Sequence, residues 1–337
     1  MTRLKRSVVT GKGLTRVRRG RGFSYLTAEG NRLKDPEALD RIDALVIPPA
    51  WHDVWISPYE NGHIQAVGTD DAGRRQYLYH PDWRRKRDEE KHDRVLAMAR
   101  RLPEWHADVA DGLAERGLGC RRVLAAALLM LDRGIFRTGG EEYAEENGTH
   151  GVATLLREHT RVHGDEVRFE YPAKGSITRA VSITDAALAP VVKSLLRSRS
   201  GSDRLLVYRE RDGWHEVHAQ DINNRFKELA GDDCSAKDLR TWNATMLAAV
   251  AFAAAPEPTS KTAGKRAEAA VMREVSEALG NTPAVCRTSY VDPRVVDAYR
   301  DGRTIAAAVK RVRRIDDDES RHAIERAVIR LLRRQTG

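Results

Sequence analysis

The stretch "ATLLREHTRVHGDEVRFEYPAKGSITRAVSIT" (Ala153–Thr184) decides the fold class. It holds three runs with the character of β-strands, separated by turns near Gly164 and Gly175. From Val167 to Tyr171, apolar and polar residues alternate with the period of a half-buried strand. The rest of the chain between residues 91 and 337 has mainly helical periodicity. We therefore predict a three-stranded sheet within a mainly helical domain.

Residues 23–90 have a different pattern, which predicts a small β-rich domain. The segments "HIQAVGTD" (His63–Asp70) and "RQYLYH" (Arg75–His80) have the composition of strands, and the Asn61-Gly62 dipeptide before them favours a hairpin turn. Residues 1–22 are basic, contain no acidic residue and predict a flexible arm. The predicted class is α+β, with an arm (1–22), a β-rich domain (23–90) and a helical domain (91–337).

Composition favours a protein of a reducing cytoplasm with a polyanionic partner. The formal net charge is +9, which suits nucleic acid or an anionic membrane surface. The three cysteines, Cys120, Cys234 and Cys286, are scattered and form no CxxC pair, which argues against a disulfide framework. No apolar run reaches the roughly 20 residues of a membrane span, and the N-terminus lacks the apolar core of a secretory signal.

Three candidate motifs lack the features of a metal or nucleotide site, which favours an activity without a metal or a nucleotide cofactor. "TGKGLT" (Thr10–Thr15) lacks the spacing of a phosphate-binding loop. His159 and His163 fall in a strand-and-turn segment, where a spacing of four does not bring two ligands together. The acidic run Asp316–Glu319 is typical of a solvated surface.

Five residues, each unremarkable alone, together predict chemistry at a phosphodiester. Arg137 follows an apolar helix, Lys174 lies at a hairpin tip, Arg240 lies at a helix start, Asn281 follows a helix-ending glycine, and Tyr290 precedes a new helix. Taken singly, they are a surface ion pair, two solvated charges, a turn residue and a half-buried aromatic. Together they supply two guanidinium groups, an ammonium, an amide and a phenol.

This set is sufficient to attack a phosphodiester without a metal. The phenol is the nucleophile, and because an unperturbed phenol has a pKa of about 10, it needs cationic neighbours. The arginines bind the non-bridging oxygens and stabilise the charge of the transition state. The lysine donates a proton to the leaving oxygen.

At these residues the chain resembles the type IB DNA topoisomerases of the small poxvirus and bacterial kind. The resemblance extends from about Phe23 to Ala308. It is carried, in the family's order, by "IPPAWHDVWISP", "GHIQAVGTDDAGRRQYLYHPDW", "FRTGGEEYAEENGTHGVATL", "KDLRTWNAT" and "GNTPAVCRTSYVDP".

The resemblance implies a C-shaped clamp on duplex DNA and assigns the catalytic positions. The family's two arginines fall on Arg137 and Arg240, its hairpin lysine on Lys174 and its nucleophile on Tyr290. Asn281 stands where many relatives have histidine, and an amide donates a hydrogen bond but carries no charge. DNA contacts carry over to Gln76, Tyr77, Tyr79 and Tyr143.

The implied reaction needs neither ATP nor a metal. The tyrosine forms a 3′-phosphotyrosyl bond and frees a 5′-hydroxyl, the downstream duplex rotates, and the hydroxyl attacks back to reseal the strand. The resemblance further implies a monomer that acts on DNA of the bacterial nucleoid.

Two other functions remain open from the sequence. A tyrosine recombinase shares the catalytic set, but usually has a histidine three residues before the second arginine, where this chain has Lys237, and usually has a helical N-terminal domain. A non-enzymatic basic DNA-binding protein would not need the ordered set of five residues. Relaxation of supercoiled plasmid in EDTA without ATP separates the three.

Overall fold

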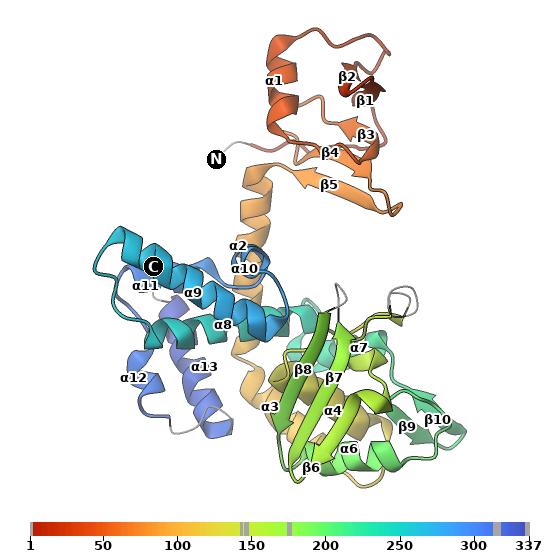
Figure 1. Ribbon diagram of the computed structural model, residues 1–337, viewed down its shortest axis with the longest axis vertical. Coiled ribbons are helices and arrows are strands. Elements are labelled where there is room, and N and C mark those ends of the chain that lie inside the picture. The colour runs from red at the N-terminus through yellow and green to blue at the C-terminus, as the bar shows by residue number, and fades with distance from the viewer. Residues whose placement is uncertain (1–2, 142–143, 145–147, 174–176, 313–317, 334–337) are drawn as a thin grey trace. The chain divides into compact units, whose positions relative to one another are not determined.

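The computed structural model describes residues 3–141, 144, 148–173, 177–312 and 318–333 (Figure 1). The chain forms two compact units, Met1–Lys91 and His92–Gly337. The structure is mixed α+β, with a β-sheet in the first unit and a mainly helical second unit, as the sequence predicts.

In its described residues, the N-terminal unit contains a five-stranded antiparallel sheet, a helix that packs against this sheet, and the start of a second helix at Pro81. The strand order is β2-β1-β3-β4-β5. Helix α1 begins after Asp35, whose side chain accepts a hydrogen bond from Glu37 N, and contributes Ile42 to the small apolar core. The elements are β1 (Leu14–Arg19), β2 (Gly22–Leu26), α1 (Pro36–Ala44), β3 (His52–Ile56), β4 (Ile64–Thr69) and β5 (Arg75–Tyr79).

The predicted flexible arm at residues 1–22 is wrong for the described residues 3–22. Leu14–Arg19 forms strand β1, which pairs with both β2 and β3. Leu14 is part of the core, and the Arg16 guanidinium donates to the backbone carbonyls of Pro48 and Trp51. The high charge hid the strand because a strand needs only its backbone and one face to pair and pack, while Arg18 and Arg19 stay exposed.

The described residues of the C-terminal unit are mainly helical and form two small sheets. Helix α2 (Pro81–Ala99) crosses the boundary between the units. The remaining elements are α3 (Leu102–Ala114), α4 (Cys120–Arg133), the 3₁₀ turns η1 (Val152–Thr154) and η2 (Arg157–His159), β6 (Thr160–His163), β7 (Glu166–Ala173), β8 (Ile177–Thr184), α6 (Leu188–Arg197), β9 (Val207–Glu210), β10 (Gly213–Glu216), α7 (Ala219–Ala230), α8 (Ala236–Ala254), α9 (Lys261–Leu279), α10 (Pro283–Ser289), α11 (Pro293–Arg300), α12 (Ala306–Val309) and α13 (Asp318–Arg333).

The predicted three-stranded sheet is confirmed as β6-β7-β8, drawn in green in Figure 1. Val167, Phe169 and Tyr171 are buried and alternate with more exposed residues on β7. They join a core that includes most of α4 and α8. Residues 174–176, which follow β7 and precede β8 in the sequence, lie outside the described part of the chain. The pairing of β8 with β7 along its whole length therefore fixes β8 against the helical core.

A buried carboxylate, Asp132, connects four helices of this unit. Its Oδ1 lies 2.5 Å from Arg321 Nη2 of α13, and its Oδ2 lies 3.1 Å from His106 Nε2 of α3. Asn243 of α8 donates to the Asp132 carbonyl at 3.0 Å. Burial alone would raise the pKa of Asp132, but Arg321 and His106 hold it well below its usual range. The ionised carboxylate is thus the state that the fold stabilises.

We expect Asp132→Asn to lower the free energy of unfolding at pH 7 by about 3 kcal/mol, because Arg321 would lose its buried counter-charge. Since the pKa is depressed in the folded state, the contribution is present above pH 3.8, the ordinary pKa of the carboxyl, and is lost as the pH falls below it. Urea denaturation across this range should show the difference between wild type and variant shrinking. Asp111→Asn, on the exposed side of α3, is the control. An equal loss in both variants would contradict the role of Asp132.

Candidate active site

Arg137 lies in a connection that is held in place by backbone hydrogen bonds. The connection leaves α4 through Gly134 and Ile135, and Ile135 has a φ of 50°, which is uncommon for a β-branched residue. The Arg137 carbonyl accepts from Val152 N at 2.9 Å, and the next carbonyl accepts from Ala153 N at 2.8 Å. The base of the arginine is therefore fixed by the η1 turn.

Arg240 lies near the start of α8 and is buried, with 4% of its surface exposed. The sequence alone favoured a solvated charge at this position. Instead, its guanidinium donates to the carbonyls of Ile135 and Leu279, and so joins the end of α4, the start of α8 and the end of α9. Its Nε has no hydrogen-bond partner among the described residues.

Asn281 contacts Arg137 directly. Gly280 ends α9 in the left-handed conformation, with φ 60°, as the sequence predicts for a helix-ending glycine. This turn directs Asn281 Oδ1 to 2.5 Å from Arg137 Nη2. The amide nitrogen of Asn281 is buried and has no partner within the described chain. The side chain thus uses its oxygen to bind Arg137 and keeps an N–H donor available.

Tyr290 ends α10 and is mostly buried, with 7% of its surface exposed. The centre of its ring lies 5.5 Å from Arg240 Cζ. Its backbone is held by Thr245 of α8, whose Oγ1 lies 3.3 Å from the Tyr290 carbonyl oxygen and accepts from Asp292 N at 3.1 Å. The turn after Tyr290 is therefore tied to the same helix that carries Arg240.

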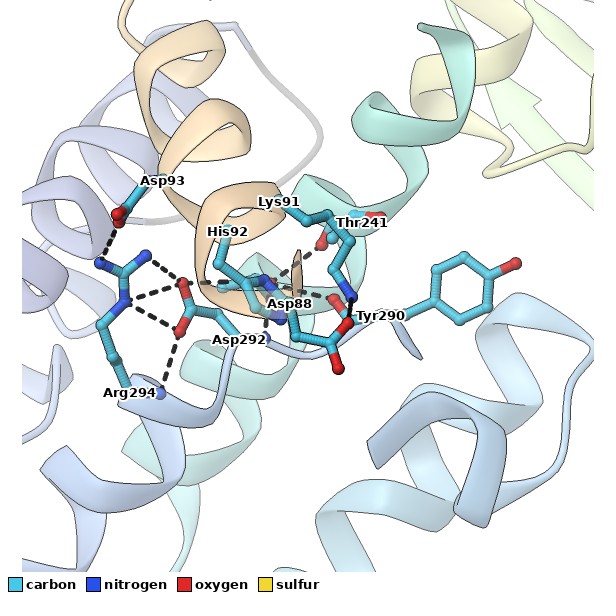
Figure 2. Close-up of polar contacts among 9 residues, drawn as sticks. Asp88, Lys91, His92, Asp93, Thr241, Tyr290, Asp292 and Arg294 are labelled. Carbon is cyan, nitrogen blue, oxygen red and sulfur yellow. Dashed lines mark hydrogen bonds and ion pairs between the residues drawn. The ribbon is translucent and has the colours of Figure 1, made fainter. Parts of the chain in front are cut away.

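Asp292 anchors this turn from its other side. Its carboxylate caps α11 by accepting from Arg294 N at 2.9 Å, and Arg294 Nη2 lies 2.7 Å from it. Arg294 also binds Asp93 at 2.8 Å. Figure 2 shows the Tyr290 ring directed away from the Asp292–Arg294 pair. The Asp292–Arg294 ion pair thus fixes the backbone after Tyr290, and the phenol ring lies beside Arg240.

The site is strongly cationic. Burial lowers the pKa of Arg240 to about 10; Arg137 acts in the same direction, and Tyr290 opposes it. Burial also lowers the pKa of Arg179 on β8, with Tyr171 opposing and Arg137 reinforcing. None of the described contacts of Arg137 and Arg240 is with a carboxylate. A bound anion would therefore offset charges that the fold leaves uncompensated.

The structure brings four predicted residues together, namely Arg137, Arg240, Asn281 and Tyr290. Lys174 and Tyr143, which the sequence also predicts, lie outside the described residues. The prediction overlooked Arg179, whose guanidinium donates to the carbonyls of Gly134, Ala278 and Leu279, and it overlooked Thr245. Neither has a local sequence signal, because each acts on segments far away in the chain.

The other predicted DNA contacts belong to the N-terminal unit. Tyr77 and Tyr79 lie on one face of β5, each more than one-third exposed, with ring centres 6.0 Å apart and planes 16° from parallel. Gln76 Nε2 donates to Asp70 Oδ2 at 2.9 Å. Exposed, stacked aromatic rings of this kind are suited to contact with a flat or extended ligand.

Two groups of histidine and carboxylate side chains in the described chain are close enough to hold a metal ion, and neither includes Arg137, Arg240 or Tyr290. They are His106 with His322 and Glu325, and Glu210 with Asp212 and His215. Among the described residues, no helix combines the length and apolar character that a membrane crossing requires.

Two family models match the chain. The model described as bacterial DNA topoisomerase IB, N-terminal domain, matches residues 22–70, and the model described as eukaryotic DNA topoisomerase I, catalytic core, matches residues 80–317.

Similar proteins include DNA topoisomerases 1B of viruses. The enzyme of Acanthamoeba polyphaga mimivirus is 26% identical over 298 residues, covering 86% of this chain and 88% of the relative. That of vaccinia virus (strain Copenhagen) is 22% identical over 245 residues, covering 70% and 72%. A solved structure, the XerH site-specific recombinase bound to difH substrate, is 17% identical, with a TM-score of 0.35, and covers 58% of this chain and 51% of that one.

We expect Gly151→Ala to destabilise the connection that carries Arg137. A Cβ at Gly151 would lie 2.5 Å from Gly139 N and 2.6 Å from the Arg137 carbonyl oxygen, and backbone atoms cannot give way easily. The expected loss is about 1–3 kcal/mol, measured by thermal or urea unfolding. The matched control is Gly140→Ala, where a Cβ meets no atom within 4 Å. Equal stability of both variants would show that this contact does not constrain the connection.

Proposed function

The chain belongs to the type IB DNA topoisomerase family, whose members are isomerases, and we propose that it relaxes supercoiled duplex DNA through a 3′-phosphotyrosyl intermediate at Tyr290. The observation that carries this proposal is the convergence of Arg137, Arg240, Asn281 and Tyr290 from four separate segments of one unit. Such a set offers a nucleophile beside hydrogen-bond donors for a phosphate.

In the proposed cleavage step, Tyr290 Oη gives its proton to solvent water and forms a bond to the scissile phosphorus, while the bond to the 5′-oxygen breaks and that oxygen takes a proton from the general acid. Arg137 and Arg240 bind the non-bridging oxygens and stabilise the charge that develops in the transition state. Arg240 is suited to this role because two of its nitrogens already bind backbone carbonyls, so the group is positioned before the substrate arrives.

Asn281 is proposed as a neutral donor to the same phosphate. Its oxygen is held by Arg137, so its unpartnered amide nitrogen is the atom that would face a phosphate oxygen. Removing one donor of this type from an enzyme costs roughly 10²- to 10³-fold in rate when the donor stabilises a transition state.

Lys174 is proposed as the general acid that protonates the departing 5′-oxygen. This assignment rests on the family resemblance of the hairpin sequence, because Lys174 lies outside the described residues. In the reverse step the same amine would take the proton back from the 5′-hydroxyl, which attacks the phosphotyrosine and frees Tyr290.

We further propose that one chain is sufficient for the reaction and that the cycle needs neither ATP nor a metal. The tyrosine and both arginines come from the same compact unit, and the energy of the broken phosphodiester is kept in the tyrosyl bond. The proposed substrate associates the protein with the nucleoid of a bacterial cytoplasm.

The proposed DNA contacts are Gln76, Tyr77 and Tyr79 on β5, and Tyr143 in the segment after Arg137. With a net charge of +9, binding should weaken steeply as salt rises, because basic side chains release counterions from the phosphates. A site-specific recombinase remains the second candidate from the sequence, and the requirement for paired specific sites distinguishes it.

We expect Tyr290→Phe to abolish relaxation of supercoiled plasmid in EDTA without ATP, and to abolish the covalent protein–DNA adduct, while the DNA dissociation constant changes less than about threefold. The matched control is Tyr299→Phe. The Tyr299 hydroxyl donates to the Pro256 carbonyl at 2.8 Å and its ring stacks on Phe252, so it has a structural role. Relaxation by Tyr290→Phe, or loss of the adduct in Tyr299→Phe alone, would assign the nucleophile elsewhere.

We expect Lys174→Ala to slow strand cleavage by about 10²- to 10⁴-fold on ordinary DNA, the usual contribution of general acid catalysis. On a substrate with a 5′-bridging sulfur the slowing should be much smaller, because a thiolate leaves without protonation. Single-turnover cleavage of the two substrates measures this. Equal slowing on both would contradict the role of Lys174 as the acid.

A further inference from the structure

Two histidines and a glutamate, none of which has a role in the proposed reaction, meet between α3 and α13. They are His106 on α3, with His322 and Glu325 on α13, and their potential ligand atoms all lie within 4.8 Å of one another. His106 Nδ1 lies 3.0 Å from His322 Nε2. His322 and Glu325 are three residues apart on one helix, a spacing that places both side chains on the same face.

Glu325 is a buried carboxylate without a hydrogen bond. Its side chain is 3% exposed, and neither carboxylate oxygen has a hydrogen-bond partner among the described residues. Arg321 Nε lies 3.3 Å from Oε1 but outside hydrogen-bond geometry. Burial raises the pKa of Glu325, and Arg321 opposes this. A buried polar group in this condition calls for an ion or a water that completes its contacts.

His106 is oriented as a metal-binding histidine usually is. Its Nε2 lies 3.1 Å from Asp132 Oδ2, so this nitrogen is the proton donor and the other, Nδ1, is directed toward His322. A carboxylate that holds the second ring nitrogen of a ligating histidine fixes its tautomer and raises its basicity. The same carboxylate would do so here.

The charges suit a divalent ion of the zinc type. Arg321 lies 2.5 Å from Asp132 and 3.3 Å from Glu325, so one guanidinium faces two carboxylates, and the second negative charge is left for the ion. Two imidazoles and one carboxylate form a donor set that zinc favours, at distances of about 2.0–2.2 Å, with a fourth position for water. Two neutral imidazoles, one carboxylate and one Zn²⁺ ion would together carry a net charge of about +1, as in other sites with this donor set.

We propose that His106, His322 and Glu325 bind one Zn²⁺ ion that joins α13 to α3. Helix α13 begins after residue 317, the last residue that the catalytic-core family model matches. The proposed ion would therefore stabilise the docking of a C-terminal helix that the family core does not include. The proposal is independent of the chemistry at Tyr290, and relaxation in EDTA should persist.

The test uses the full chain, stripped with EDTA and then freed of chelator. We expect titration with ZnSO₄, followed by calorimetry and by elemental analysis after dialysis, to give one bound zinc per chain. Co²⁺ should give the visible absorption of a tetrahedral site. Glu325→Gln keeps the shape but removes the charge, and should weaken zinc binding at least tenfold. Zinc should raise the melting temperature of the wild type and not that of Glu325→Gln.

The matched control is His215→Ala, in the exposed group formed with Glu210 and Asp212. This variant should bind zinc as the wild type does. Absence of stoichiometric zinc in the wild type, equal binding by Glu325→Gln, or loss of binding in His215→Ala would each overturn the proposal. Metal binding and DNA relaxation are measured separately, so the zinc proposal and the topoisomerase proposal are tested independently of each other.

Discussion

The buried guanidinium of Arg240 holds together chain segments that are far apart in sequence. Its two bonds reach the Ile135 carbonyl, 105 residues away, and the Leu279 carbonyl, 39 residues away. Leu279 is the last residue of α9, where backbone carbonyls have no partner within the helix, and Ile135 lies two residues after the end of α4. One side chain thus binds one helix end and one connection, and fixes the segments that carry Arg137 and Asn281.

This arrangement has an electrostatic consequence. Among the described residues, Arg240 binds carbonyl dipoles and no carboxylate. Its positive charge is buried, and this burial, reinforced by Arg137, lowers its pKa to about 10. Arg137 is likewise bound to an amide. A phosphate would supply the missing charge, so the same contacts that build the site also favour an anionic substrate.

A second buried centre, Asp132, lies five residues before Arg137. It ties α4 to α3, α8 and α13, and its partner Asn243 is three residues after Arg240. The two arginine segments are therefore held from one side by Arg240 itself and from the other by Asp132. Thr245, two residues further along α8, extends the same support to the Tyr290 turn.

The sequence by itself determined the α+β class, the three-stranded sheet and the helix end at Gly280, because period-2 alternation and a left-handed glycine are local properties. It also pointed to Arg137, Arg240, Asn281 and Tyr290, though only as a set. It missed the pairing of Leu14–Arg19, whose charge resembles that of a disordered arm. Only the tertiary structure decided that Arg240 is buried, that Arg179 and Thr245 support the site, and that His106, His322 and Glu325 meet. Such contacts join residues tens to hundreds of positions apart, and their energy depends on burial that no local pattern encodes.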